Sequence, residues 1–468
     1  MTRINTNVSS LIAQRVLGQN QNALNQSLER LSTGLKINSG ADDPAGLIAS
    51  QNLQAEQTGI STAIDNANRA SNIVGTAEGG LNEVSSLLVQ LQGLVGQSAN
   101  SGGLSSDEVA ANQLQVDSIL GTINRISQST TFEGKQLLNG NLDYTTSGVV
   151  TSSLGNVQIN SAAVPDGGSV SVAVQVVASG KTAAVTYTGG TVTGNTVTIE
   201  VASNLGTQQL SFASGTTVSS IATAINGVKN STGLSAQVSG TDLRVNSTQY
   251  GSAQFVSIKA VAGTFTTSTG KAFGKDANVT INGAAAQTTG LNVSYRTAGL
   301  DLSLDVSTKF DKPGTTTFAI TGGGATFALG SKVTETGKAS IGIASVSTGS
   351  LGDSTNGFLS TLGSGGTNSL SSNNLTTAQR ILTEAINQVS SLRGRIGAFQ
   401  KFTIGSTVNS LGVAFENASA AESAITDTDF AKETSNLTRA QILSQASQTV
   451  LAQANAAPQA ALTLLRGG

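Results

Sequence analysis

Residues 60–95 read ISTAIDNANRASNIVGTAEGGLNEVSSLLVQLQGLV, and this stretch decides the fold. Apolar residues recur in it at steps of three and four, with one polar lapse at Ser71 and one skipped step near Glu78. The recurring positions are Ile60, Ile64, Ala67, Ser71, Val74, Leu81, Val84, Leu88, Leu91 and Val95. A stripe this narrow over about ten turns is typical of a coiled-coil helix, which needs a partner helix to bury it.

The same rhythm returns near the other end of the chain and indicates that partner. Its positions are Leu382, Ala385, Val389, Leu392, Ile396 and Phe399, followed after a slip near Phe402 by Ile404, Val408, Leu411, Phe415 and Ala418. We expect the two stretches to pack within one chain as a helical rod. The predicted packing residues of this rod are Ile60, Ile64, Val74, Leu81, Leu88, Leu91, Leu392, Ile396, Phe399, Leu411 and Phe415.

The two extreme ends also carry helical patterns. A first helix, capped by Asn7 or Ser9, is predicted to end in the turn-rich residues 38–46, where Pro44 opens the long second helix. A last helix is predicted from 429 to about 457, with apolar residues on more than one side. Because short helices of this kind gain little from one partner, we expect them to pack between copies of the chain. The predicted assembly residues are Leu17, Leu24, Leu28, Leu31, Leu35, Leu437, Ile442, Leu443, Val450, Leu451 and Leu465.

A third helix is predicted over residues 105–128, because Ser105 and Glu108 have capping-box spacing. Its expected seam is Val109, Val116, Ile119, Ile123 and Ile126, and a β-hairpin is expected near 131–140.

From 144 to 371 the pattern changes to a period of two, as in Val170, Val172, Val174 and Val176, which predicts strands. Further predictions are a hairpin of strands 191–193 and 196–199 around Gly194-Asn195, a short helix over 217–226, and a flexible return at 363–369. The fold class is therefore α + β and multidomain: a discontinuous helical coiled-coil core at both ends, and a central, mostly β insertion of one or two domains.

The composition excludes several classes of function. Net charge is −2 with 11% charged residues, so no basic face exists for nucleic acid. With no His and no Cys, Ser/His/Asp and Cys/His triads and His-based zinc sites are impossible, and we expect neither enzyme activity nor a cofactor or metal. The acidic residues Asp42, Asp43, Asp427, Asp429 and Glu433 are interpreted as helix caps and dipole partners. No apolar stretch is long enough for a membrane span, and residues 1–30 lack the features of a cleaved signal peptide.

The two ends resemble the bacterial flagellins over about 1–143 and 372–468. The motifs that carry the resemblance are Ile4-Asn5-Thr6-Asn7, 28–38 (LERLSTGLKIN), 41–46 (ADDPAG), Gln97-Ser98-Ala99-Asn100, Phe132-x-Gly134, Ala440-Gln441-Ile442-Leu443, 450–455 (VLAQAN) and 458–466. Each motif is weak alone, but their order along the chain is specific.

The resemblance implies a subunit that polymerises into the extracellular bacterial flagellar filament used for swimming, after export through the flagellar type III route without a cleaved signal peptide. It implies an inner core of 1–44 with 427–468, an outer-core rod of 45–143 with 372–426, and a surface-exposed insertion of 144–371. Implied partners are other copies of the chain, the export apparatus and its chaperone, and hook-associated and cap proteins.

One departure from the family concerns the innate immune receptor that senses many flagellins. Their Arg-rich segment before the Gln97-Ser98-Ala99-Asn100 stretch is replaced here by residues 89–94, VQLQGL, so we expect weak or no receptor activation. Two alternatives stay open: a hook-filament junction protein, and an adhesin or receptor ligand acting through the β insertion.

Overall fold

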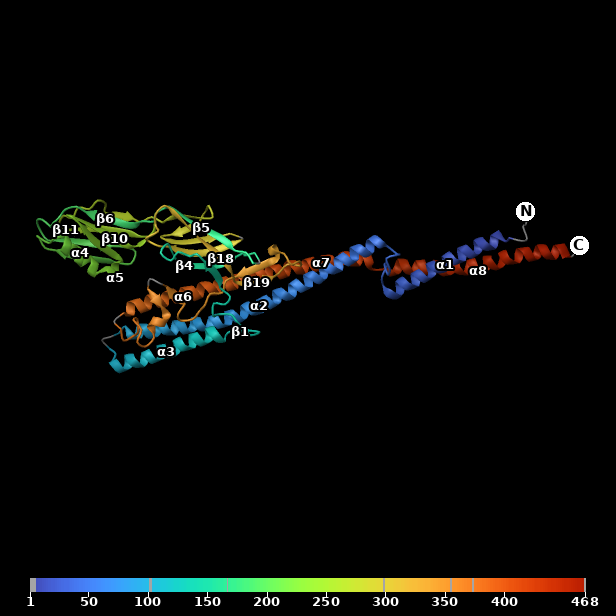
Figure 1. Ribbon diagram of the computed structural model, residues 1–468, viewed down its shortest axis with the longest axis horizontal. Coiled ribbons are helices and arrows are strands. Elements are labelled where there is room, and N and C mark those ends of the chain that lie inside the picture. The colour runs from blue at the N-terminus through green and yellow to red at the C-terminus, as the bar shows by residue number, and fades with distance from the viewer. Residues whose placement is uncertain are drawn as a thin grey trace. The chain divides into compact units, whose positions relative to one another are not determined.

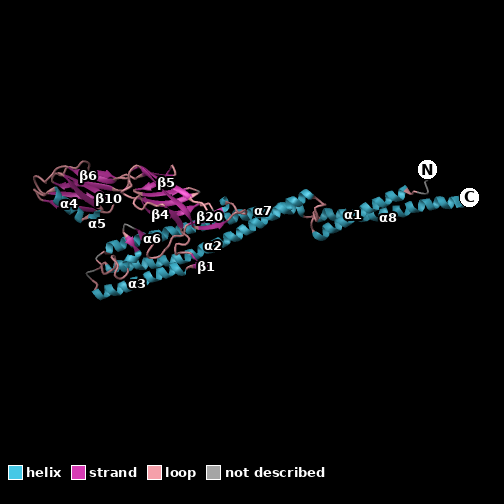
Figure 2. Ribbon diagram, in the orientation of Figure 1, coloured by secondary structure: helices cyan, strands magenta, loops and turns pink. Residues whose placement is uncertain are grey.

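The computed structural model describes residues 6–100, 103–165, 167–297, 299–353, 356–372 and 374–466, with side chains up to residue 457. The chain divides into two compact units: residues 1–68, 329–333 and 405–468 form the first, and residues 69–328 and 334–404 form the second. Helices at both ends and strands between them confirm the predicted fold class (Figures 1 and 2).

The helices follow the terminal segments. They are α1 (Val8–Thr33), α2 (Pro44–Ser98), α3 (Ser106–Ser129), α4 (Val218–Gly227), α5 (Lys229–Thr232), α6 (Leu375–Ala398), α7 (Gly405–Thr426) and α8 (Phe430–Arg466), with 3₁₀ turns η1 (Glu335–Gly337) and η2 (Leu359–Leu362) and a π-helical turn η3 (Phe399–Ile404). Ser105 and Glu108 form the predicted capping box of α3. In the described part of the chain, no helix is both long and apolar enough to cross a membrane.

The buried seam of α2 is more regular than the sequence indicated. It runs without a gap through Ile60, Ala63, Ala67, Ala70, Val74, Ala77, Leu81, Val84, Leu88, Leu91 and Val95. The predicted polar lapse at Ser71 and the skipped step near Glu78 were wrong, because Ala70 and Ala77 occupy those steps. Ile64 lies beside the seam and is only half-buried, since Ala63 takes its place.

Ala63, Ala70 and Ala77 were overlooked, although Ala67 was counted, because alanine is small and its hydrophobicity marks a seam only weakly. A coiled coil nevertheless accepts it wherever the facing helix approaches closely. In the seam of α3, Val116 and Ile123 are buried as predicted, but Leu120 and Ser127 are buried in place of Ile119 and Ile126, and Gln113 is buried while Val109 is not.

The sequence slip near Phe402 coincides with η3. Seam residues Leu392, Ile396 and Phe399 keep steps of four and three, but the next one, Ile404, comes five residues later. A π-helical turn holds one residue more than an α-turn, so it absorbs this insertion. Within the second unit, α2 and α6 are also joined by polar contacts: Arg393 Nε donates to Glu78 Oε1 at 2.9 Å, and Gln400 Nε2 donates to Ser71 Oγ at 3.0 Å.

The strands pair antiparallel throughout the described registers. They are β1 (Thr131–Phe132), β2 (Lys135–Gln136), β3 (Tyr144–Ser147), β4 (Leu154–Ala162), β5 (Val170–Ala178), β6 (Thr182–Tyr187), β7 (Val197–Ala202), β8 (Thr207–Phe212), β9 (Leu234–Ser239), β10 (Asp242–Tyr250), β11 (Phe255–Ala262), β12 (Lys271–Phe273), β13 (Asn278–Ile281), β14 (Ala284–Ala285), β15 (Gln287–Thr289), β16 (Asn292–Arg296), β17 (Leu300–Val306), β18 (Gly314–Gly323), β19 (Ala325–Ala328), β20 (Lys338–Ile341), β21 (Gly352–Asp353) and β22 (Gly357–Phe358).

Two β lobes are visible, and one is inserted into the other (Figure 2). The interrupted lobe, residues 144–178 and 277–323, contains sheets β14-β13-β5-β18-β3 and β15-β16-β17-β4. The nested lobe, residues 181–275, contains sheets β6-β10-β9 and β12-β11-β7-β8 with α4 and α5. The chain passes from one lobe to the other where Ala178 pairs with Asn278 and Lys181 bridges Lys275.

Two predictions in this region were wrong. Residues 191–193 form no strand, and β7 pairs with β8 and β11 instead of with a hairpin partner around Gly194. The expected flexible return at 363–369 is a packed segment against α3: Asp117 Oδ1 accepts from Ser364 N at 2.8 Å, and Gln113 Oε1 accepts from Leu370 N at 2.7 Å. Its Gly and Ser content reflects tight turns, which short-range composition does not distinguish from flexibility.

Candidate assembly surface

The joint between α1 and α2 is ordered by local hydrogen bonds in the first unit. Gly34 ends α1 with a φ of 75°, a left-handed value that glycine adopts without strain. Asp42 Oδ2 accepts from the backbone N–H of Asn38 at 3.2 Å and of Ser39 at 2.9 Å, and these bonds, with the Ser39 backbone as the leading cause, lower the pKa of Asp42. Asp43 Oδ1 accepts from Gly46 N at 2.9 Å and caps α2, the role expected for it.

The start of α8 is tied to this joint. Leu35 and Asp427 form an antiparallel bridge, and Lys36 N donates to Thr426 O at 2.6 Å. Asp429 Oδ1 accepts from Ala431 N at 3.0 Å and Lys432 N at 3.1 Å, so it caps α8 as expected. In the described part of the chain, no group of three or more acidic side chains is arranged to hold a metal ion.

Helices α1 and α8 lie side by side and antiparallel, with the two ends of the chain at the same end of the pair (Figure 1). Their shared seam alternates half-buried leucines with small and polar residues. On α1 the positions run in steps of three and four through Ser10, Ala13, Leu17, Asn20, Leu24, Ser27 and Leu31, and on α8 through Glu433, Leu437, Ala440, Ser444, Ser447, Leu451 and Ala454; all are buried or half-buried.

Polar contacts set the register of the pair along its length. Near the chain ends, Asn7 Nδ2 donates to Ala454 O at 2.7 Å. In the middle, Asn20 Nδ2 donates to Ser447 Oγ at 2.6 Å. Toward the joint, Arg30 Nη1 lies 3.9 Å from Glu433 Oε2, and the Glu433 side chain is buried between the two helices. A polar layer in a coiled-coil seam favours one alignment over its shifted alternatives.

Large apolar side chains on the same two helices point away from the seam and are exposed. They are Val8, Leu11, Ile12, Val16, Leu28 and Leu35 on α1 or just after it, and Phe430, Ile442, Leu443 and Val450 on α8. We call these ten residues the terminal apolar surface. Leu11 is 58% exposed and Ile442 is 61% exposed, so single copies of the chain leave most of this surface in water.

The predicted assembly residues thus fall into two groups. Leu17, Leu24, Leu31, Leu437 and Leu451 are half-buried in the α1–α8 seam, whereas Leu28, Leu35, Ile442, Leu443 and Val450 are exposed. Leu465 lies in the last turn of α8, and its side chain is outside the described residues. The motif residues Ile4 and Asn5 are also outside them.

Sequence reasoning missed the small seam residues Ser10, Ala13, Ser27, Ser444 and Ser447, whereas Ala440 was named. Their spacing of three and four was the available signal, but Ser carries no hydrophobicity and was therefore not counted. In the rod, Val74, Leu81, Leu88, Leu91, Leu392 and Ile396 are buried, as is Ile60 in the first unit. Phe399 and Leu411 are half-buried, and Phe415 is 38% exposed.

Paired end helices with a partly polar seam, an exposed apolar surface and a β insertion between them define a class of self-associating structural subunit. Comparisons with known proteins give that class a family. Models of the bacterial flagellin N-terminal and C-terminal helical regions match residues 4–143 and 379–465.

Relatives that match the chain over nearly its full length belong to the same family. The chain is 32% identical to Flagellin D of Vibrio anguillarum, 30% identical to Polar flagellin F of Vibrio parahaemolyticus and 31% identical to Flagellin B of Vibrio cholerae, in each case over 99% of both chains. The chain belongs to the bacterial flagellins, and it is a structural subunit of the extracellular flagellar filament, as the sequence indicated.

Proposed function

We propose that the chain polymerises through the terminal apolar surface, with α1 and α8 of each copy packing against those of its neighbours. The observation that supports this is the division of side chains on the two helices: the seam between them uses mainly small and polar residues with five half-buried leucines, while ten other large apolar side chains stay exposed. Burying one Leu, Ile or Val side chain contributes about 1.5–3 kcal/mol, so ten such residues supply a strong association energy.

The same division explains why neighbours are needed. Ala and Ser bury little apolar area, so the α1–α8 seam offsets only part of the entropy lost when some sixty residues become ordered, at roughly 1–2 kcal/mol per residue. Neighbouring copies supply the rest. Contacts of this head-to-tail kind that do not close into a ring generate an open helical filament.

We propose the corresponding domain roles. Residues 1–44 and 427–468 form the inner core of the filament, residues 45–143 and 372–426 form the outer-core rod, and residues 144–371 project from the surface. Export through the flagellar type III route without a cleaved signal peptide, and contacts with an export chaperone and with hook-associated and cap proteins, belong to the same proposal by family resemblance. The 99% span shared with filament flagellins favours the main subunit over a hook-filament junction protein.

We also propose that the chain activates the vertebrate innate immune receptor for flagellin weakly or not at all. The segment 89–94 on α2 exposes Val89, Gln90 and Gly93 and carries no charge. It therefore offers no guanidinium for a charge-assisted hydrogen bond to a receptor carboxylate. A receptor-reporter assay that gives full activation by the monomer would contradict this.

Sedimentation of full-length variants tests the assembly proposal. Ile442→Gln and Leu11→Gln are expected to remain helical monomers and to stay in the supernatant under assembly conditions, because each places an amide where an apolar contact forms. The matched control is Leu205→Gln in the nested lobe, which is 64% exposed and is expected to polymerise normally. Deletion of residues 1–30 or 440–468 should likewise leave a folded remainder that does not polymerise. Normal filaments from the Gln variants or from either truncation would overturn the proposal.

A further inference from the structure

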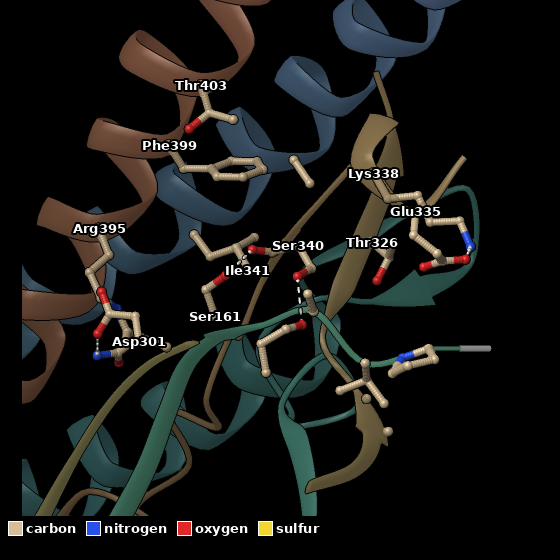
Figure 3. Close-up of a pocket in the computed structure, with 18 of the residues that line it drawn as sticks. Ser161, Asp301, Thr326, Glu335, Lys338, Ser340, Ile341, Arg395, Phe399 and Thr403 are labelled. Carbon is tan, nitrogen blue, oxygen red and sulfur yellow. Dashed lines mark hydrogen bonds and ion pairs between the residues drawn. The ribbon is translucent and has the colours of Figure 1, made fainter. Parts of the chain in front are cut away.

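A cavity of about 660 Å³ lies in the second unit, between the end of α6 with its π-helical turn η3 and the strands at the base of the interrupted lobe (Figure 3). Side chains reach it from α6, η3, β4, β17 and the β19–β20 hairpin. Its volume falls in the range of about 300–1,000 Å³ that is usual for small-molecule sites. None of the residues of the terminal apolar surface lines it.

A cation without a direct counter-ion lines this cavity. Arg395 donates from Nη2 to Gly342 O at 3.4 Å, a long hydrogen bond, and none of the ion pairs found among the described residues involves Arg395. Burial lowers the pKa of the Arg395 guanidinium from its ordinary value, while Asp301 and Asp143 act against that shift. A partly desolvated cation of this kind favours an anion beside it.

The nearest acid is already engaged. Asp301 Oδ2 accepts from Arg296 Nε at 2.7 Å, and its Oδ1 accepts from Asn160 Nδ2 at 2.8 Å. At the rim, Lys338 Nζ is paired with Glu335 Oε1 at 2.9 Å. Among the described lining residues, Arg296, Lys338 and Arg395 are basic and Asp301 and Glu335 are acidic; Asp143, outside the lining, also interacts with Arg395.

Two buried polar atoms of the lining have no hydrogen-bond partner. They are Arg395 Nε, a donor, and Asn160 Oδ1, an acceptor. Buried polar atoms are nearly always paired, so a donor and an acceptor left open on one cavity indicate a missing group that offers both functions. The guanidinium has the planar, forked donor geometry that matches a carboxylate.

Apolar side chains also line the cavity. Phe399 and Phe402 of η3 line the cavity together with Ile341 of β20, and Phe402 is 67% exposed although it is aromatic. Figure 3 shows Phe399 and Arg395 extending from the same helical side of the cavity, with Ser340 and Ile341 across from them. The π-helical turn brings both aromatic residues to the cavity, and such turns are frequent at functional sites.

We propose that this cavity binds a small organic acid that carries a ring and a hydroxyl group. Its carboxylate pairs with the Arg395 guanidinium, its ring packs on Phe399 and Phe402, and its hydroxyl donates to Asn160 Oδ1. The Arg395 guanidinium selects the acid over its neutral analogue.

Ligand-observed saturation-transfer NMR on the full-length monomer tests the proposal with 4-hydroxybenzoate as the probe. Wild-type protein is expected to bind it at millimolar or lower concentration, and the neutral 4-hydroxybenzamide about ten-fold more weakly. Arg395→Gln is expected to weaken 4-hydroxybenzoate binding by about ten-fold or more, with partial recovery in Arg395→Lys. The matched control is Arg380→Gln, an exposed arginine of the same helix that is not part of the lining, and it should bind like the wild type.

Phe402→Ala gives an independent reading if the Arg395 variants fold poorly, because the Phe402 side chain is exposed and its removal does not affect a core. It is expected to weaken binding several-fold. Absence of saturation transfer to 4-hydroxybenzoate in the wild type overturns the proposal, as do equal affinities for the acid and the amide or unchanged binding in both Arg395→Gln and Phe402→Ala. The result is independent of polymerisation, which the Ile442 and Leu11 variants test separately.

Discussion

Asn20 Nδ2 donates to Ser447 Oγ at 2.6 Å across the middle of the α1–α8 pair, in a seam whose neighbouring positions are Leu17 and Leu24 on the α1 side. Ser447 is 7% exposed, and its hydroxyl also donates to Leu443 O at 2.7 Å. The pair therefore has a polar layer where a purely hydrophobic seam would accept several alignments. The alignment of α1 with α8 therefore depends in part on the Asn20 side-chain amide.

Asn20→Ala tests that layer in the monomer. The variant loses the cross-helix hydrogen bonds, and we expect the α1–α8 pair to open more easily by about 1 kcal/mol. Amide hydrogen exchange of α1 and α8 measures this as reduced protection. Asn22→Ala, an exposed asparagine on the same helix, is the control and should leave protection unchanged. Equal protection in the Asn20 and Asn22 variants would show that the layer does not set the pairing.

Leu81→Ala probes the helical core of the second unit. Leu81 is fully buried in the α2 seam, so its truncation removes apolar contacts and leaves a cavity. We expect the helical transition in urea to lose about 2–5 kcal/mol of unfolding free energy, followed by far-UV circular dichroism. Val89→Ala on the same helix, 57% exposed, should change it by less than about 0.5 kcal/mol. A loss of similar size in both variants would place Leu81 outside the core.

The nested lobe is expected to be removable. Its two ends enter and leave between paired strands, since Ala178 faces Asn278 and Lys181 faces Lys275, and it has a hydrophobic core of its own. Replacing residues 181–275 by a short Gly-Ser turn should leave the interrupted lobe folded, as judged by dispersed amide signals in NMR.

Extending that deletion to 170–281 supplies the contrast. It removes β5, which pairs with both β13 and β18, and should unfold the interrupted lobe. If the shorter deletion also unfolded that lobe, the two hydrophobic cores would not be independent.

The raised pKa of Glu384 makes the stability of the fold depend on pH. Burial, and after it the nearby Asp353 carboxylate, raise the pKa of Glu384 above its ordinary value of 4.5. The folded state therefore holds this proton more tightly than the unfolded state. The contribution of Glu384 to stability is fully present below pH 4.5 and is lost as the pH rises through the raised folded value.

Glu384→Gln removes this charge while keeping an oxygen that accepts from Gln388 Nε2, a bond of 3.2 Å in the native chain. We expect the variant to be more resistant to urea than the wild type at pH 7, with a smaller gain near pH 4. Glu83→Gln, on the exposed side of α2, is the control and should show no such difference. A larger gain near pH 4 than at pH 7 would show that the pKa of Glu384 is lowered, not raised, in the folded state.

Much of the helical architecture was predictable because it is local. Pro44, Asp43, Asp429 and the Ser105–Glu108 capping box act within one turn of the chain, and large apolar residues such as Leu81 and Leu88 mark a seam by spacing alone. The alternating valines of β5 likewise predicted a strand, and Val172, Val174 and Val176 are buried. Several small residues of the seams were missed because Ala and Ser are found in both buried and exposed positions, so neither residue type predicts burial.

By itself, the sequence determined where most helices begin, that strands fill the middle, and to which family the chain belongs, since caps, periodicity and ordered motifs are properties of short segments. The last helix was predicted to end near residue 457, but α8 continues to Arg466. Only the tertiary structure decided which apolar residues stay exposed, that one β lobe is inserted into another, and that Arg395, Asn160 and Phe402 share a cavity. These outcomes depend on contacts between residues that lie far apart in the chain. The stripe that begins at Ile60 is completed by Ala63, Ala70 and Ala77 as well as by its leucines. An alanine can occupy a seam position only where a second helix approaches closely enough to bury it.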